Sequence, residues 1–353
     1  MAYSGPIADS GVMNVETISI RVQQESDAGG GGKQTIITEY ADVVSEAEWT
    51  TNRFDSPGKL TFTCQEDGDI KIPEGSLVEL TVDGTKLFKG YVFTAERNKE
   101  GETSYTAYDQ LRYLKANASY CFEAMSLTQI IQQIAADFGL AVGTLEDTGY
   151  LFPCLLKENE TCLDIIFDAL AQTIMQTGKI FLFYDDAGLL TLKEAKNLFL
   201  QTVIGEGSLV TDYTYKRDID SDTYNRIKLV QKNEKSGRTD AYTHEDTETI
   251  KKWGLLQYYD EVDENLNEAQ IDQMCAQYLQ YYNRVLQTLT LDALGVVGIR
   301  AGSIIPVQIN GIHDLNVTRL LLAEKVTHSF ETDDHTMSIE VKSFQQLGGM
   351  QIV

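Results

Sequence analysis

Two stretches of the chain repeat one pattern of small, apolar and polar residues over eleven positions. Residues 74–84 read EGSLVELTVDG and residues 301–311 read AGSIIPVQING. In each stretch a Gly-Ser pair precedes apolar residues at alternate positions, and an Asx-Gly pair follows them. Period-two alternation is typical of a half-buried strand, and Asx-Gly is typical of a tight hairpin turn. The pattern predicts two equivalent strands, each leaving a Gly-Ser corner and each followed by matching antiparallel partners.

Alternating segments flank both copies of the repeat and predict further short antiparallel strands. The segments on the N-terminal side are residues 15–24, 35–40, 43–51, 59–64, 87–97 and 103–108. Those in the second half are residues 210–215, 223–231, 285–293, 320–330 and 336–342. Short antiparallel strands avoid exposed sheet edges by closing into barrels. The repeat therefore predicts two related small β-barrels, at residues 1–115 and 206–345, with two unrelated hairpins as the alternative.

Between the two barrels the apolar period changes from two to 3.6, which is typical of helices. Ser126 followed by Gln129 is a capping box, and Gly139 and Gly178 are typical helix ends. The pattern predicts two amphipathic helices and a hairpin, at residues 126–138, 161–176 and 179–193. Two helices on a short sheet make a compact unit, so we expect an inserted α+β domain at residues 116–205.

The second barrel is expected to carry an insertion of its own. Helical patterns at residues 246–253 and 267–283 predict a helical insertion at about residues 245–284. Residues 346–353 are expected to form a C-terminal tail. The expected fold class is α+β and mainly β: two related small β-barrels, an α+β insertion between them, and a helical insertion in the second barrel.

The composition and charge of the chain limit the kinds of partner that it can bind. The chain has 353 residues, with 53 acidic against 29 basic residues and a formal net charge of −24. Such a surface repels phosphate backbones, so stable nucleic-acid binding is not expected. No apolar stretch approaches the roughly 18 residues of a membrane span, and the first residues lack the pattern of a signal peptide.

The cysteines are odd in number and contain no C-x-x-C pair: Cys64, Cys121, Cys154, Cys162 and Cys275. They lie mostly within apolar stretches. This pattern predicts reduced, buried thiols in a protein made in the bacterial cytoplasm.

No sequence motif indicates catalysis, a cofactor or a metal. The histidines fit neither H-E-x-x-H nor a Cys/His zinc spacing: His244, His313, His328 and His335. His328 and His335 could face each other across a hairpin, but two ligands do not make a zinc site, and we expect exposed loop histidines.

Two further patterns are also expected to be structural. The glycines at residues 29–32 lack the Lys-Ser/Thr of a P-loop and are expected at a hairpin tip. The carboxylate pairs Asp185-Asp186 and Asp333-Asp334 are expected in hairpin turns. We therefore expect no enzyme, and no catalytic, cofactor-binding or metal-binding residue.

The order of several segments resembles a known family. The segments are residues 52–60 (NRFDSPGKL), 75–90, 105–114 (YTAYDQLRYL), 126–140, 250–255 (IKKWGL) and 294–307 (LGVVGIRAGSIIPV). In this order they resemble the tail hub proteins of contractile phage tails and related particles. The chain is most similar to the XkdQ-type hub of defective prophages and phage-tail-like bacteriocins of Gram-positive bacteria.

This resemblance implies a structural protein of a phage tail or a bacteriocin particle. Hubs of this type are homotrimers whose paired barrels form a pseudo-sixfold ring, which joins the hexameric tail tube to the threefold spike. The implied partners are further copies of the chain, the tail tube protein, the central spike protein, baseplate wedge proteins, and the tape-measure protein in the lumen. The protein would be made in the bacterial cytoplasm and end in the particle.

A β-rich module that binds carbohydrate or the cell wall is the alternative. Such modules present aromatic platforms, and Tyr258-Tyr259 and Tyr281-Tyr282 could supply one. Against this, Tyr278 and Tyr282 share a helical face that is predicted to be buried.

Overall fold

The computed structural model describes residues 18–28, 32–39, 44–65, 71–233, 238–262, 266–312, 319–331 and 334–342. The chain divides into two compact units. Unit 1 comprises residues 1–214, 290–341 and 352–353, and unit 2 comprises residues 215–289 and 342–351. The first fifteen residues and the tail at 346–353 lie outside the described residues.

The strands of the N-terminal part of unit 1 follow the predicted alternation. They are β1 (Ile18–Ala28), β2 (Gly32–Glu39), β3 (Val44–Asn52), β4 (Lys59–Gln65), β5 (Leu77–Val82), β6 (Thr85–Arg97) and β7 (Glu102–Tyr108). Alternate residues of β4 and β5 are buried in one core, which also contains Trp49 and Tyr105. β1 pairs antiparallel with β2 up to Ala28 opposite Gly32, so the two strands form a hairpin, whereas residues 29–31, expected at its tip, lie outside the described residues.

The second half of the chain contributes strands to the same sheet. These strands are β14 (Val210–Asp218), β18 (Leu286–Leu294), β21 (Lys325–Glu331) and β22 (Asp334–Lys342). The sheet has eleven strands in the order β14-β18-β22-β21-β3-β4-β7-β6-β5-β1-β2. A smaller sheet contains β13 (Ile204–Gly205), β19 (Ile304–Gln308) and β20 (Arg319–Leu322).

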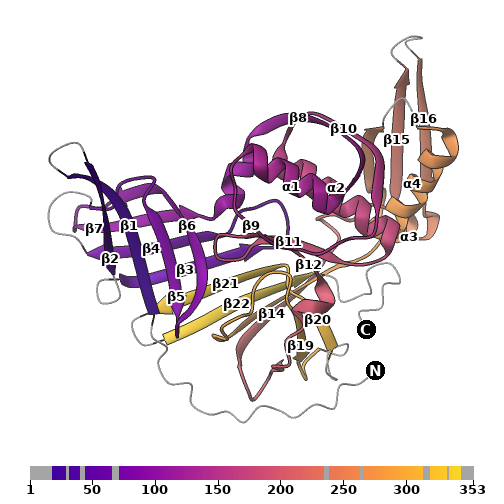
Figure 1. Cartoon of the computed structure of the whole chain (residues 1–353). Helices are drawn as coiled ribbons and strands as arrows, with labels where there is room; N and C mark the ends of the chain where they lie inside the picture. Colours follow the sequence, from indigo (N-terminus) through magenta and orange to yellow (C-terminus); the bar gives the residue numbers. More distant parts are fainter. Residues whose placement is uncertain are drawn as a thin grey trace. The chain divides into compact units, whose positions relative to one another are not determined.

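The two halves meet where β21 pairs antiparallel with β3, from Lys325 opposite Asn52 to Glu331 opposite Glu46. In Figure 1 the yellow strand β21 lies beside the violet strand β3, although the two strands are far apart in the sequence. The mainly β fold class is confirmed, and the structure adds that strands of both repeat-bearing halves share one sheet. The predicted domain boundaries stay predictions.

The two copies of the eleven-residue pattern form the same corner. In the first copy, Gly75 N–H donates to Val92 O (2.8 Å) and Val92 N–H donates to Ser76 O (3.0 Å). In the second, Gly302 N–H donates to Ala323 O (2.8 Å) and Ala323 N–H donates to Ser303 O (3.0 Å). Both glycines have positive φ, 83° and 90°.

The strands that follow the corners also match. β5 pairs antiparallel with β6, which pairs with β7. β19 pairs antiparallel with β20, and β21 then pairs with β22. Both copies therefore have antiparallel partners in the predicted order, but β5, β6 and β7 share one sheet whereas β19–β20 and β21–β22 belong to two sheets. The other neighbours differ, because β5 also pairs antiparallel with β1 whereas β19 pairs parallel with β13.

The predicted helices of the insertion begin and end at the expected caps. The elements are η1 (Gln110–Lys115), β8 (Asn117–Ser126), α1 (Leu127–Asp137), β9 (Val142–Leu145), β10 (Leu151–Thr161), α2 (Cys162–Thr177), β11 (Phe181–Asp185), β12 (Leu190–Glu194) and η2 (Ala195–Leu198). Ser126 and Gln129 form the capping box of α1, and Gly178 ends α2 in the left-handed conformation. Both helices pack on one apolar core with β11 and β12 (Figure 1).

Unit 2 is a separate small α+β unit. It contains β15 (Arg226–Asn233), β16 (Arg238–Glu245), α3 (Thr247–Trp253), β17 (Gln257–Val262) and α4 (Glu268–Tyr282). β15 lies between β16 and β17, and α4 packs Ile271 and Cys275 on Ile227 and Leu229.

The assignment of residues 223–231 to the second barrel is therefore wrong. β15 pairs parallel with β17, and parallel neighbours need a crossover connection, which here contains α3. The two predicted helices are confirmed at α3 and α4. The strand could not be placed from its sequence, because alternation gives a half-buried strand without naming the sheet that it joins.

The prediction of buried cysteines is confirmed for Cys64, Cys162 and Cys275 but is wrong for Cys121 and Cys154. The latter two lie on β8 and β10, which form a two-stranded sheet. Its inner face carries Phe122 into the core, and alternate side chains on the other face meet solvent. Among the helices of the described residues, none is long and apolar enough to cross a membrane.

The two matching corners allow a paired test of the repeat. We expect Gly75→Ala to lower the free energy of unfolding by about 1–2 kcal/mol, because the left-handed backbone crowds a Cβ. Gly302→Ala should cost ~1 kcal/mol more, since its Cβ would also lie 2.8 Å from Leu182 Cδ1, whereas a Cβ at Gly75 meets nothing within 4 Å.

Urea unfolding of both variants measures these losses. Gly75→Asn serves as the matched control, because asparagine tolerates the left-handed region and should lose less stability than alanine. Alanine variants as stable as the wild type would show that the glycines are not required by the corners.

Candidate functional site

The candidate site of unit 1 is built around Asp109, which follows β7 and is buried. Asp109 Oδ2 accepts the N–H of Gly58 (2.8 Å), and Oδ1 accepts the N–H of Leu111 (3.0 Å). The N–H of Asp109 in turn donates to Gly58 O (3.1 Å). A Cβ at Gly58 would lie 2.5 Å from Asp109 Oδ2, so only glycine permits this approach. One carboxylate therefore holds the turn before β4 against the start of η1.

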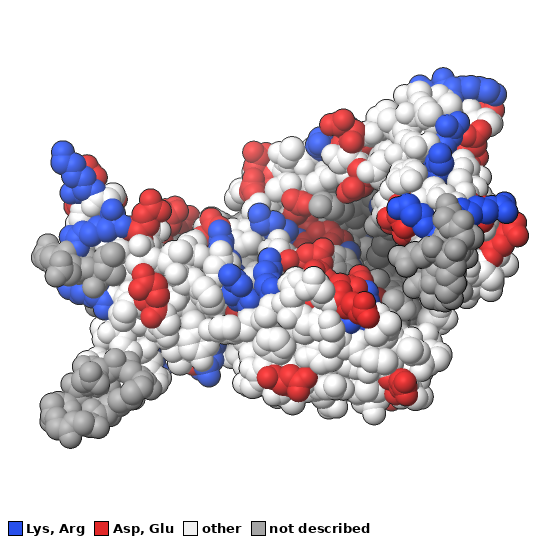
Figure 2. Space-filling model, turned by 90° about the horizontal axis from the view of Figure 1, so that it is seen from above, with Lys and Arg blue, Asp and Glu red and all other residues white. Residues whose placement is uncertain are grey.

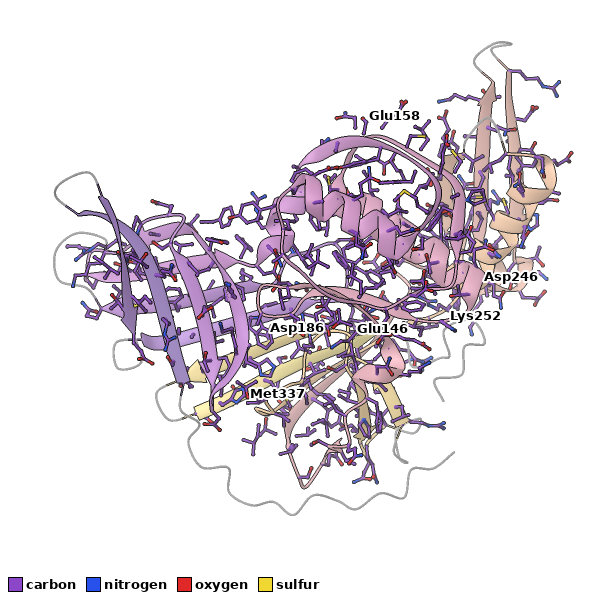
Figure 3. The ribbon with its side chains drawn as sticks, viewed as in Figure 1. Glu146, Glu158, Asp186, Asp246, Lys252 and Met337 are labelled. Carbon is purple, nitrogen blue, oxygen red and sulfur yellow. The ribbon has the colours of Figure 1, made fainter. Side chains whose placement is uncertain are left out.

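Two other buried charges lie near Asp109. Asp185, at the end of β11, accepts the N–H of Gly188 at Oδ1 (2.6 Å). Arg300 lies in the second Gly-Ser corner, with its guanidinium carbon 3.8 Å from the centre of the Tyr184 ring. The three predicted domains thus each place a charged residue in one buried cluster. Asp186, the residue directly after Asp185 and β11, is labelled in Figure 3.

The charges of this cluster depend on one another. Burial raises the pKa of the Asp109 carboxyl well above its usual range, and the neighbouring charge of Asp185 raises it further. Burial also raises the pKa of Asp185. Arg300 lowers the pKa of both carboxyls and is itself buried, which lowers the pKa of its guanidinium. Arg300 is therefore the cation that favours the ionised form of these two acids.

η1 connects the cluster to the insertion. The side-chain amide of Gln110 donates Nε2–H to Ala141 O (3.0 Å) and accepts the N–H of Ala141 (3.1 Å). An amide that makes both bonds to one peptide unit fixes the distance between η1 and the segment before β9.

A basic pocket of about 340 Å³ lies beside this cluster. Four cations line it: Lys59, Arg112, Lys115 and Lys325. The pocket residues that lie on strands are side by side on the neighbouring strands β21, β3, β4 and β7. Lys325 is opposite Asn52, and Lys59 is opposite both Thr50 and Tyr108. Ser56 and Pro57, next to the Gly58 that Asp109 holds, complete the lining.

The four cations of the basic pocket form no ion pair within the described part of the chain. The adjacent acid Glu324 is occupied by Arg53 in a two-point contact, with both N···O distances 2.7 Å. Elsewhere acids and bases are intermixed, as the visible face in Figure 2 shows. A pocket that gathers four cations without an ion pair is therefore unusual in a chain of net charge −24.

The expectation of exposed loop histidines is wrong for His328. His328 lies on β21, is fully buried, and contacts the rings of Trp49 and Phe330. Its Nε2 lies 2.7 Å from Ile299 O, and its Nδ1 lies 2.9 Å from His335 Nε2. The two histidines do face each other across the β21–β22 hairpin, whose β22 strand carries Met337 in Figure 3. Because Ile299 O can only accept, neutral His328 carries its proton on Nε2 and accepts at Nδ1.

The remaining histidines and the aspartate pairs singled out in the sequence are spread over the chain. His244 lies in unit 2, 3.1 Å from Asp272, while His313 and Asp333 lie outside the described residues. Asp185 and Asp186 do lie at a hairpin turn, as predicted. No group of three or more metal-ligating side chains occurs among the residues that the structure describes.

The tyrosine platform of the alternative function is not assembled as proposed. Tyr258 and Tyr282 stack on each other at 5.4 Å within the apolar cluster of unit 2. Tyr259 and Tyr281 are exposed, but no ring contact between them is found among the described residues, and Arg284 covers the Tyr281 ring.

Sequence reasoning missed Asp109, Arg300 and the basic pocket. Asp109 could have been found as a residue typical of a helix N-cap before the QLRYLK turn. Arg300 could have been found as a lone charge inside the apolar run that precedes the second corner. The pocket had no local signal, because its lysines come from three distant segments.

Replacing Arg300 tests the buried charge cluster. We expect Arg300→Met to lower the free energy of unfolding by about 3 kcal/mol at pH 8 and by less at pH 5. Without the cation the folded-state pKa of both carboxyls rises further above the unfolded value of about 3.9. A carboxyl whose pKa is raised by folding destabilises the folded state as the pH rises through that pKa.

Urea unfolding at the two pH values measures the deficit, with Arg21→Met as the control because Arg21 is exposed on β1. A deficit that is the same at pH 5 and pH 8 would contradict the proposed dependence on carboxylate charge.

We expect the burial of His328 to cause a separate loss of stability in acid. Burial, and the nearby charge of His335, lower the pKa of His328 to about 4. Its contribution is fully present above the unfolded value of about 6.5 and is lost as the pH falls toward 4, because the unfolded chain binds the proton more tightly. The loss should amount to about 3 kcal/mol at most.

His328→Gln, which cannot titrate, is expected to remove this part of the pH dependence between pH 6.5 and 4.5 in urea unfolding. An unchanged slope in the variant would assign the acid sensitivity to other groups.

The chain is similar to two curated proteins of Bacillus subtilis (strain 168). It is 31% identical over 312 residues to the phage-like element PBSX protein XkdQ, covering 86% of this chain and 94% of XkdQ. It is 31% identical over 313 residues to the uncharacterized protein YqbQ, with the same coverage.

A solved structure shares the fold. The 43 kDa tail protein of prophage MuSo2 from Shewanella oneidensis superposes with a TM-score of 0.63 at 15% identity, covering 92% of this chain and 98% of that protein. The resemblance to XkdQ-type proteins drawn from the sequence is confirmed. Residues 47–342 match the family described as YQBQ-like, and over that span the chain is a member of this family.

Proposed function

We propose that this chain is a structural component of a phage tail or phage-tail-like particle and serves as the hub of its baseplate. Three copies would form a ring with pseudo-sixfold symmetry, which joins the hexameric tail tube to the threefold spike. Its partners would be further copies of itself, the tube protein, the central spike protein and baseplate wedge proteins, with the tape-measure protein in the lumen. The finished protein would reside in the particle.

The observation that carries this proposal is the repeated corner. Gly75 and Gly302 make equivalent backbone hydrogen bonds and precede strands of the same pattern. Two similar structural elements per chain give six per trimer, which is the number needed to face a sixfold tube. A closed ring also needs head-to-tail contacts that rotate back on themselves, and a duplicated element provides two related surfaces for them.

The relatives support a structural role over a catalytic one. XkdQ belongs to the phage-like element PBSX, and the MuSo2 protein is a tail protein. The buried cluster of Asp109, Asp185 and Arg300 serves the junction of three segments, since its carboxylates accept backbone N–H groups at turns.

Copy number in assembled particles tests the proposal. We expect three copies of this chain per particle end, measured by quantitative mass spectrometry against the tube protein, whose copy number would be six times the number of tube rings counted in micrographs of the same particles. Cryo-electron microscopy of the same particles should show six related domains around the tail axis.

Six copies per ring, or density for the chain away from the tail axis, would refute the trimeric hub while leaving the family assignment intact. Absence of the chain from purified particles would refute the structural role itself.

A further inference from the structure

We infer that the basic pocket is a binding site for carboxylates, and that its occupant is a short acidic segment of another protein chain. This inference does not depend on the trimeric ring, because it concerns the chemistry of a single pocket in unit 1. It starts from the four cations that line the pocket: Lys59, Arg112, Lys115 and Lys325.

These cations are held in place from separate parts of unit 1. Lys59 lies on β4 and Lys325 on β21, whereas Arg112 and Lys115 lie on η1. Asp109 fixes η1 through the N–H of Leu111 and fixes the Ser56–Pro57 side of the pocket through the N–H of Gly58. The pocket is therefore shaped by buried hydrogen bonds rather than by flexible surface chains alone.

The charges of the pocket are available to a ligand. None of the four cations has a carboxylate partner within the described residues, and Lys59 and Arg112 are half-buried. The exposed carboxyl of Asp55 offsets part of this positive charge, because Lys115 interacts with it electrostatically and opposes the rise of its pKa. The remaining like charges repel one another, and a bound anion relieves that repulsion. The guanidinium of Arg112 adds a planar pair of donors that suits the two oxygens of a carboxylate.

Three uncharged side chains in the same pocket can also donate hydrogen bonds to a carboxylate. The side chains of Asn52, Ser56 and Tyr108 line the pocket, and no hydrogen bond joins them to other described residues. A carboxylate has about four lone-pair sites to satisfy, so charged and neutral donors together can complete its hydrogen bonds.

An acidic protein segment fits these features better than a nucleic acid. The chain carries a net charge of −24, which repels an extended polyanion over its whole length. A short acidic loop brings only a few charges and meets the local positive field. The volume of about 340 Å³ suits one or two carboxylate side chains.

Binding at this place would link segments that are distant in sequence. The pocket lies on the β21–β3 pairing and reaches η1, so one acidic segment would contact strands from both halves of unit 1 and the start of the insertion. The bound partner would strengthen the contact on which unit 1 is built.

The test uses the full-length chain and a fluorescein-labelled hexaglutamate peptide at low salt, with binding followed by fluorescence anisotropy. The double variant Lys115→Glu/Lys325→Glu changes two exposed pocket residues. The matched control, Lys99→Glu/Lys179→Glu, changes two exposed lysines outside the pocket, and both variants change the formal net charge from −24 to −28.

We expect saturable binding that weakens at least tenfold in the pocket variant and less than twofold in the control, with both variants unfolding at the wild-type urea midpoint. Hexaglutamine should not compete, and added salt should weaken binding. Self-association of the chain that only the pocket variant abolishes would identify the occupant as a second copy.

Three results would overturn the inference. They are the absence of saturable binding, equal weakening in both variants, and tighter binding of a six-residue oligothymidylate that the pocket variant abolishes. The last result would identify a phosphate site, and none of the three would bear on the copy number of the chain in particles.

Discussion

The antiparallel pairing of β21 with β3 is the contact on which unit 1 depends, because it joins the two repeat-bearing halves into one sheet. Buried Thr51 reinforces it by accepting the N–H of Ala301 (2.9 Å) and donating to Val326 O (3.4 Å). At its end, Arg53 binds Glu324 through two N···O contacts of 2.7 Å. A two-point Arg–carboxylate contact is directional, so it fixes the strand register as well as the approach of the two halves.

The buried charge cluster imposes a second constraint at the same junction. Charges removed from water are costly, and a buried pair stabilises a fold less than its geometry suggests. We expect the cluster of Asp109, Asp185 and Arg300 to contribute specificity, because Arg300 offsets the charge of both carboxylates only when η1, β11 and the second corner are all in place. A mispositioned insertion would separate Asp185 from Arg300 and leave its carboxylate without that cation.

Much of the fold could be predicted from local signals. The caps at Ser126 and Thr161 are chemical features of the first helical turn, so the sequence alone locates both helices. Period-two alternation likewise locates β4 and β5. Sheet membership could not be predicted, because the same alternation serves β15 in unit 2. His328 was misjudged for a related reason: its burial comes from the rings of Trp49 and Phe330, and Trp49 is brought beside it only by the β21–β3 pairing.

The two corners show how a repeated backbone can acquire different side-chain functions. In the first corner Ser76 N–H donates to Pro73 O (3.2 Å), and in the second Ser303 N–H donates to Arg300 O (3.0 Å). The backbone turn is therefore the same, but proline offers no charge where arginine extends a guanidinium over Tyr184 of the insertion. The two corners therefore differ at this position in their contact with the insertion. The two copies thus share the hydrogen bonds of the corner, whereas the residue just before the repeat, Pro73 or Arg300, differs and contacts the inserted domain in the second copy.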